Sequence, residues 1–136
     1  MTYSDKQMSI IEDFELFEDW LQKYEFIIEL GKEIELIPEE EKTNDLLIDG
    51  CQSRVWLKSE FKNNKMHYSA DSDAIITKGI ISLLIKVMNK EKPSIIAKED
   101  LFFIEKIGLQ EHLSPTRSNG LLEMVKRMKM DAIKYA

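Results

Sequence analysis

Apolar residues in the first 31 positions recur every three or four residues, which is the spacing of a helix that buries one face. They include Ile10, Phe14, Phe17, Leu21, Tyr24, Ile27 and Ile28. Ser4-Asp5 followed by Gln7 resembles an N-terminal capping box, and Gly31 is typical of the residue that ends a helix. We therefore predict helix over this region, as two helices that meet near Asp19.

The next part of the chain loses the helical period. Pro38 and the acidic residues after it interrupt the pattern, and residues 43–53 are rich in Asn, Asp, Gly and Ser, which predicts a loop. Beyond the loop, alternate residues are apolar in two short stretches separated by Asn63-Asn64, a pair typical of a tight turn. The apolar positions are Val55, Leu57, Phe61, Met66, Tyr68 and Ala70. The pattern predicts an antiparallel β-hairpin.

Helical spacing returns in the second half of the chain. Residues 71–73 (DSD) form a cluster of N-cap residue types before a long predicted helix that ends ahead of Pro93. A shorter helix is predicted from about residue 99 to 107, closing at Gly108, and Ser114-Pro115 begins a last helix. The predicted fold class is α+β, with one small antiparallel β-sheet flanked by helices.

The composition is that of an ordinary globular protein. The 136 residues are 43% hydrophobic with only 5 Gly and 3 Pro, which predicts one compact domain over residues 1–136 with a real core. No apolar run approaches the ~18 residues of a membrane span, and the first 14 residues lack the basic and apolar regions of a signal peptide. We therefore expect a cytoplasmic protein that does not enter a membrane.

Charge is distributed unevenly along the chain, whose net charge is −6. Residues 1–50 carry 15 acidic and 4 basic side chains and residues 51–136 carry 10 acidic and 15 basic ones, which gives net charges of −11 and +5. The basic residues are scattered, without the interleaved aromatic residues of a nucleic-acid surface. Because the whole chain is also acidic, nucleic acid is not an expected partner.

Cys51 is the only cysteine, so this chain by itself forms no disulfide and no thiolate-rich zinc or iron–sulfur site. It lies in the predicted loop, between Gly50 and Gln52-Ser53. Gly50 suits a tight bend, and a loop held by a rigid sheet can present a thiol to a partner. Arg54, three residues on, would favour the thiolate if its side chain turned back. The alternative interpretation is a small buried residue that packs as a hydrophobe.

The two histidines are the only candidate bases for chemistry at this thiol. The alternation of the hairpin places His67 on its solvent face, and His112 stands just before the predicted entry of the last helix. With Cys51 they span about 60 residues without the ligand spacing of a metal site. No metal site is therefore expected, and a Cys-dependent hydrolase with His112 as base is one alternative function.

Four segments of the chain occur in the same order, with compatible spacing, as the motifs of a known family. They are WLQKYEFIIELG (20–31), NDLLIDGCQSRVW (44–56), ADSDAIITKGI (70–80) and HLSPTRSNGLLEM (112–124). The chain resembles the SufE-type sulfur acceptors, also called cysteine desulfuration proteins, over nearly its whole length. The main departure is the connector over residues 34–43, which is acidic here and varies in the family.

The resemblance implies a fold and an activity. The implied fold is a small antiparallel sheet flanked by helices, SufE/IscU-like, shared in outline with iron–sulfur scaffold proteins. The implied activity is that of a sulfur carrier and activator rather than an enzyme. Cys51 would accept sulfane sulfur as a persulfide from a SufS-like cysteine desulfurase and pass it to a SufBCD-like scaffold for iron–sulfur cluster assembly. The pyridoxal phosphate (PLP) would reside on the desulfurase, and no cofactor is expected here.

Five residues are expected to support the Cys51 loop and its docking. Gly50 forms the bend, and Gln52 and Ser53 either contribute hydrogen bonds within the loop or simply form the turn. The resemblance implies the other two, Asp73 and Arg117. Asp73 is a helix N-cap by its local sequence, while the resemblance places it beside the Cys51 loop and gives it influence on loop mobility and desulfurase docking. Arg117 is a cation at a helix N-terminus, which the helix dipole disfavours, so we expect an acidic partner or a desulfurase contact for it. The alternative within this setting is a docking adaptor whose thiol is dispensable.

Overall fold

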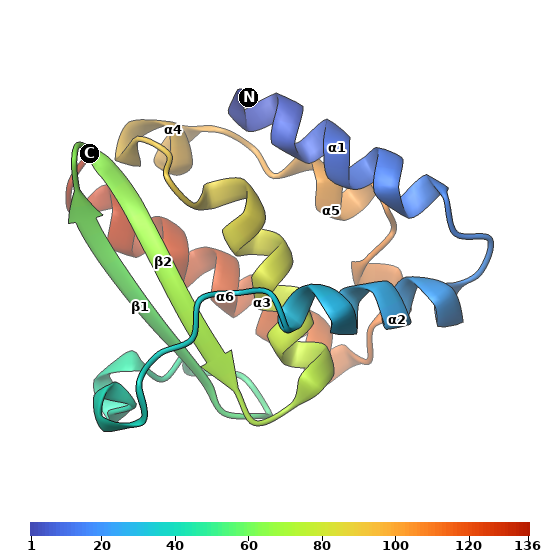
Figure 1. Cartoon of the computed structure of the whole chain (residues 1–136), viewed down its shortest axis with the longest axis horizontal. Coiled ribbons are helices and arrows are strands. Elements are labelled where there is room, and N and C mark those ends of the chain that lie inside the picture. Colours follow the sequence, from blue (N-terminus) through green and yellow to red (C-terminus); the bar gives the residue numbers. More distant parts are fainter.

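The computed structural model describes residues 1–136 as six α-helices and one two-stranded antiparallel sheet (Figure 1). The elements are α1 (Tyr3–Glu15), α2 (Trp20–Gly31), β1 (Val55–Lys62), β2 (Lys65–Ser72), α3 (Ile75–Met88), α4 (Pro93–Lys98), α5 (Phe102–Lys106) and α6 (Pro115–Ile133). Three short 3-10 turns are η1 (Glu39–Glu41), η2 (Asn44–Leu46) and η3 (Gln110–His112). The predicted α+β class, a small antiparallel sheet with helices around it, is confirmed.

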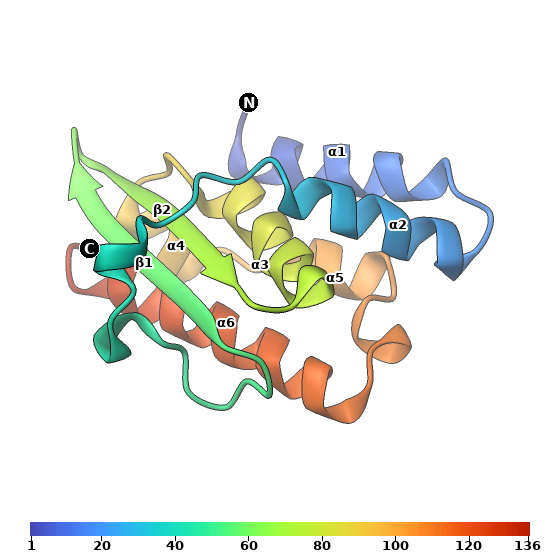
Figure 2. The ribbon, with the colours of Figure 1, turned by 60° about the horizontal axis from the view of Figure 1, so that its bottom comes forward.

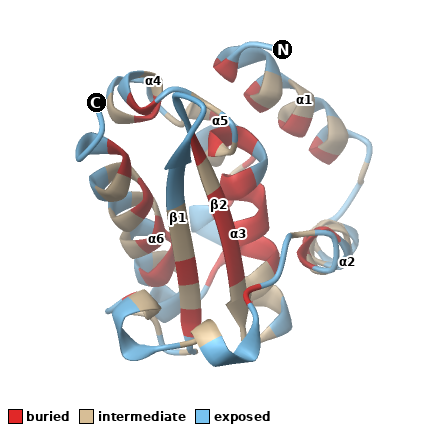
Figure 3. Ribbon diagram, turned by 60° about the vertical axis from the view of Figure 1, so that its left-hand side comes forward, coloured by how far each residue is buried: buried red, intermediate tan, exposed pale blue.

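Helix α3 forms the centre of the molecule. It contacts α1, α2, α6 and β2, and Figure 1 shows it between the hairpin on one side and α1 and α2 on the other. Ten of its 14 residues are buried, as expected for a helix that is apolar on nearly all sides, and Figure 3 shows this as an almost continuous buried ribbon. No helix in the structure is both long enough and apolar enough to cross a membrane.

The hairpin forms as its pattern predicts. β1 and β2 pair from Val55↔Ser72 to Lys62↔Lys65, and Asn63 and Asn64 both have positive φ, at 55° and 62°. Positive φ at both turn residues is typical of the type I′ turn, whose twist matches that of the strands. One face of the hairpin is buried toward α3, so the position of the segment before Val55 is set by a well-defined sheet.

The first two helices meet as predicted, but their ends differ from the expectation. Asp19 is the N-cap of α2, and its side chain accepts a hydrogen bond from the Gln22 N–H. The capping box of α1 uses Thr2 with Asp5, rather than Ser4-Asp5 with Gln7. Gly31 is the last residue of α2 and not a left-handed stop after it.

Gly31 is required by packing instead. A Cβ added at Gly31 would lie 2.9 Å from the backbone N of Gly79 in α3, and one added at Gly79 would lie 2.2 Å from the carbonyl O of Ile27. The two glycines therefore let α2 and α3 cross with their backbones almost in contact. This crossing holds the first helical pair against the centre of the fold.

Two further boundaries differ in the second half. β2 runs on to Ser72 and the N-cap of α3 is Ala74, without a side-chain cap, so the DSD cluster does not cap this helix. The predicted helix over 99–107 is the shorter α5, and α4 precedes it with Pro93 at its start. The last helix begins as predicted, because Ser114 is its N-cap and accepts from the Arg117 N–H.

Candidate functional site

Cys51 lies in the loop between η2 and β1, and Figure 2 shows this loop beside α6. Residues 49–53 form the tip of this loop. Before the tip, the Ile48 N–H donates to the Val55 carbonyl at 2.9 Å, and Leu47 forms an isolated bridge with Trp56. Ile48 is buried in the main core. The loop is thus anchored to the first residues of β1 before it turns out toward Cys51.

The Cys51 side chain is half-buried between the loop and α6. Its thiol donates to the Gly120 carbonyl, with Sγ 3.8 Å from the oxygen, and it packs against the main core. A Cβ at Gly120 would lie 3.4 Å from Sγ, so the absence of a side chain at Gly120 leaves room for the sulfur. Burial raises the pKa of the Cys51 thiol above its ordinary value, and the nearby Glu123 carboxylate raises it further. Both effects favour the protonated thiol over the thiolate in this position.

Two hollows adjoin the sulfur. A cavity of about 40 Å³ is lined by Cys51, Gln52, Ser53, Thr77, Ile80, Thr116, Arg117, Gly120 and Met124. An open surface hollow of about 440 Å³ is lined by Gly50, Cys51, Gln52, Pro115, Thr116 and Asn119. Cys51 belongs to both linings, so its side chain adjoins both a small cavity and an open surface hollow.

Gly50 forms the bend that the sequence predicted. It has φ +88°, in the left-handed region that favours glycine, and an added Cβ would lie 2.8 Å from Cγ of Glu123. Its carbonyl accepts from Nδ2 of Asn119 at 3.1 Å. On the other side of Cys51, Oε1 of Gln52 accepts from Oγ1 of Thr116 at 3.1 Å.

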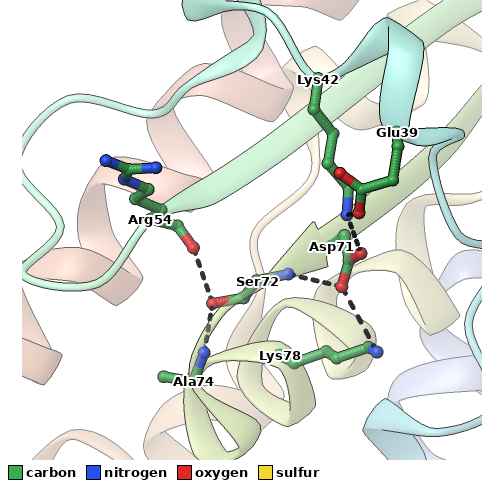
Figure 4. Close-up of polar contacts among 7 residues, drawn as sticks. All are labelled: Glu39, Lys42, Arg54, Asp71, Ser72, Ala74 and Lys78. Atoms are coloured by element: carbon green, nitrogen blue, oxygen red, sulfur yellow. Dashed lines mark hydrogen bonds and ion pairs between the residues drawn. The ribbon is translucent and has the colours of Figure 1, made fainter.

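Asp73 is placed beside the Cys51 loop, as the family resemblance implies, and it is not a helix cap. Its Oδ1 accepts from the Arg54 backbone N–H at 3.1 Å. Ser72 Oγ donates to the Arg54 carbonyl at 2.8 Å and accepts from the Ala74 N–H at 3.2 Å (Figure 4). The polar groups before α3 therefore fix the backbone three residues after Cys51.

An ion-pair cluster around Asp71 holds the acidic connector (residues 34–43) near the end of β2 (Figure 4). Lys42 Nζ lies 2.6 Å from Asp71 and 2.6 Å from Glu39, and Lys78 Nζ lies 3.3 Å from Asp71. Burial alone would raise the pKa of Asp71, but the hydrogen bond from Lys42, a backbone hydrogen bond from Ser72 and the Lys78 charge outweigh it and lower that pKa. The cluster joins the connector, the end of β2 and α3.

The other charged candidate residues make fewer contacts. Arg54 does not contribute to the pKa of Cys51, and Figure 4 shows its guanidinium pointing away from the cluster. Arg117 is exposed, lines the small cavity and forms no ion pair within this chain. An acidic partner for Arg117 is therefore not supplied by the chain itself.

Neither histidine reaches the thiol. His112 stacks on Trp20 with ring centroids 4.0 Å apart, and its Nδ1 lies 2.9 Å from the Gly108 carbonyl O. His67 is half-buried on the hairpin rather than fully exposed, and its Nε2 is buried without a hydrogen-bond partner. Neither ring lines a hollow at Cys51. The structure thus provides no histidine base for a hydrolase reaction at this sulfur.

Comparison with known proteins identifies the family of this chain. Residues 8–132 match the family model described as SufE, Fe-S metabolism associated domain. The chain belongs to the SufE family. The resemblance expected from the four sequence segments is therefore confirmed, and a role in Fe–S metabolism follows for this member of the SufE family.

Individual relatives agree with this assignment. An uncharacterized SufE-like protein of Rhizobium etli is 41% identical over 128 residues, which are 90% of this chain and 86% of that protein. The cysteine desulfuration protein SufE of Wigglesworthia glossinidia brevipalpis is 33% identical over 129 residues, which are 93% of this chain and 90% of that protein. The solution structure of a hypothetical protein from Thermus thermophilus matches with a TM-score of 0.78 over 96% of this chain and 95% of that chain, at 19% identity, and supports the fold alone.

Sequence reasoning missed several residues that contact the Cys51 loop in this SufE-family structure. They are Thr116, Asn119, Gly120, Glu123 and Arg127. All lie on α6, and the first four belong to or adjoin the HLSPTRSNGLLEM segment that the sequence did single out. Within that segment the sequence analysis predicts only Arg117 as a site residue, because its charge at a helix start is unfavourable and because the family resemblance implies an arginine there.

Proposed function

We propose that this protein carries sulfane sulfur on Cys51, taking it from a SufS-like cysteine desulfurase and delivering it to a SufBCD-like scaffold for iron–sulfur cluster assembly. The observation that carries the proposal is the position of the only thiol, at the tip of a loop and between a surface hollow and a small cavity. Membership of the SufE family supports it.

The transfer step is an exchange between sulfur atoms. The Cys51 thiol first loses its proton to solvent or to a group of the partner, and the thiolate then attacks the outer sulfur of the desulfurase persulfide. A new S–S bond forms on Cys51, the S–S bond of the donor breaks, and the donor cysteine leaves as a thiolate. No net oxidation or reduction takes place. Because such exchange needs alignment more than a local base, positioning by the partner replaces a catalytic triad.

The small cavity suits the product of this step. Its volume of about 40 Å³ exceeds the roughly 10–15 Å³ that a cavity needs to hold one water molecule, so it has room for one further atom of sulfur size. Ile80 and Met124 contribute apolar surface to it. The outer sulfur of a Cys51 persulfide would lie there, away from small thiols in solution. Because the chain has no second cysteine, that sulfur can leave only to another molecule.

The neighbouring residues support docking and loop position in this proposal. Gly50, Gln52 and Ser53 shape the tip, and Asp73 holds the backbone after it. Arg117 is exposed beside the cavity without an ion pair, and we assign it to an acidic group on the desulfurase. The desulfurase holds the PLP, so its stimulation by this protein arises from docking and from removal of the persulfide sulfur.

The direct test is incubation of the protein with the cognate desulfurase and cysteine, followed by intact-mass measurement. The wild type should gain the mass of one sulfur atom, which dithiothreitol should remove, and Cys51→Ser should gain none. Full labelling of Cys51→Ser would contradict the carrier function. Desulfurase stimulation should fall strongly in Cys51→Ala. Unchanged stimulation by that variant would instead favour a docking adaptor with a dispensable thiol.

A further inference from the structure

The Cys51 loop is fixed firmly on its N-terminal side. Ile48 is only 6% exposed, and its N–H donates to the Val55 carbonyl at 2.9 Å. The Arg127 guanidinium donates to the Leu47 carbonyl at 3.2 Å and to the Asp45 carbonyl at 2.9 Å. Ile48 therefore marks the last firmly held residue before the tip.

The C-terminal side is fixed just as closely. The Arg54 N–H donates to Asp73 at 3.1 Å, and the Arg54 carbonyl accepts from Ser72 Oγ at 2.8 Å and from the Asp73 N–H at 3.3 Å. The segment between the two fixed ends is residues 49–53, with Cys51 in the middle.

All the hydrogen bonds that hold the tip come from α6. None of residues 49–53 takes part in a backbone–backbone hydrogen bond outside helices and strands, and none lies in a helix or strand. Their hydrogen bonds are those from Asn119 to the Gly50 carbonyl, from Thr116 to the Gln52 side chain, and from the Cys51 thiol to the Gly120 carbonyl. Sulfur is a weak hydrogen-bond donor, so the first two are the stronger contacts.

We infer that Thr116 and Asn119 are positioning residues that hold the tip against α6 and set how often Cys51 leaves its docked position. The two residues are three apart on α6 and so share one face of that helix. Their partners, Gly50 and Gln52, flank Cys51 directly. This inference rests on the proposed function, in which Cys51 must be docked between transfers and exposed during them.

The location of these contacts links release to docking. Thr116 and Asn119 are exposed and line the open hollow together with Gly50 and Gln52. Water or a partner covering the hollow can replace both hydrogen bonds, because neither is shielded. A partner that binds there competes for the groups that hold the tip. Binding of the partner therefore frees the Cys51 side chain from its position against α6.

The test measures the alkylation rate of Cys51 by iodoacetamide in Asn119→Ala, Thr116→Val and the double variant. A net hydrogen bond of this kind changes an equilibrium about two- to tenfold, so each single variant should react about two to ten times faster, and the double variant faster than either. Because burial raises the pKa of the docked thiol, the midpoint of the pH–rate profile should also fall in the double variant.

Two variants provide controls. Thr116→Ser keeps the hydroxyl and should react at the wild-type rate. Ser118 lies in the same turn of α6 and accepts from Gln110 at 3.3 Å, away from the loop, so Ser118→Ala should also leave the rate unchanged. A double variant that reacts at the wild-type rate, or no faster than Ser118→Ala, would overturn the inference.

Alkylation needs no desulfurase, which separates this inference from the proposed function. Faster alkylation in the double variant supports the role of Thr116 and Asn119 even if Cys51 never receives sulfur from a desulfurase. Labelling of wild-type Cys51 together with unchanged alkylation in the double variant would overturn the role of these residues and leave the sulfur carrier in place.

Discussion

Replacing Gly50 by alanine should shift the tip of the loop, and Cys51 with it, away from its half-buried position against α6. Gly50 has φ +88°, and an added Cβ would lie 2.8 Å from Cγ of Glu123. A left-handed backbone costs a residue with a Cβ about 1–2 kcal/mol, whereas the reduced freedom of the unfolded chain offsets about 0.4–1 kcal/mol in global stability. Undocking of the tip relieves both the backbone strain and the contact with Glu123. The strain therefore acts mainly on the equilibrium between the docked and undocked positions of the tip on α6, and only weakly on the free energy of unfolding.

Two measurements follow from this argument. A docking equilibrium changed by about 1–2 kcal/mol should make alkylation of Cys51 about 5- to 30-fold faster in Gly50→Ala. The free energy of unfolding, measured with urea, should fall by only about 1 kcal/mol, because the offset in the unfolded chain acts on this quantity alone.

Gly108 supplies a matched control for the Gly50 variant. Gly108 has φ +70°, and an added Cβ would meet no atom closer than 3.7 Å, at Nδ1 of His112. Gly108→Ala should thus carry the same kind of backbone strain at a position that lines neither hollow at Cys51, with a similar loss of stability and no change in alkylation. If Gly50→Ala lost stability while its alkylation rate stayed at the wild-type value, the assumed link between strain and docking would be refuted.

Three further predictions concern charges near the site. Glu123→Gln should lower the pKa of Cys51, because the carboxylate raises it, and so speed alkylation at neutral pH; an unchanged pH–rate profile would contradict this. Asp71 has a lowered folded pKa, so its carboxylate stabilises the fold above the unfolded pKa of about 3.9, and the contribution is lost as the pH falls through the folded value. Urea unfolding of wild type and Asp71→Asn should therefore differ at neutral pH and converge in acid, and a constant difference would count against the ion-pair cluster. Arg117→Glu should weaken binding to the desulfurase, measured by calorimetry, and equal affinities of this variant and the wild type would remove Arg117 from the interface.

Local sequence patterns predicted the elements whose physics is local. The hairpin follows from an alternating pattern and an Asn-Asn turn, and the start of α6 from Ser114-Pro115. The same reasoning placed Gly50 at a bend. In each case the interactions that decide the structure lie within a few residues of one another, so a short stretch of sequence is enough to predict the local structure.

The missed features depend on distant parts of the chain. Acidic and hydroxyl residues before an apolar run fit a helix cap, and only the pairing of β1 with β2 shows that Asp73 binds Arg54 instead. The role of Gly31 required the position of Gly79, 48 residues later in α3. The contact of Asn119 with Gly50 joins positions 69 residues apart, and neither residue type announces the other. Helix α4 has only six residues, too few for a period to emerge.

The Asn63-Asn64 turn has a consequence at the opposite end of the hairpin. β1 has eight residues, so the turn lies about 26 Å from the segment that carries Cys51. A slip of one residue in the pairing would exchange the inner and outer faces of the strand and shift the loop by about 3.3 Å. The register of the hairpin thus sets the position of the Cys51 loop. A change in turn length would misplace the thiol although no residue near it had changed.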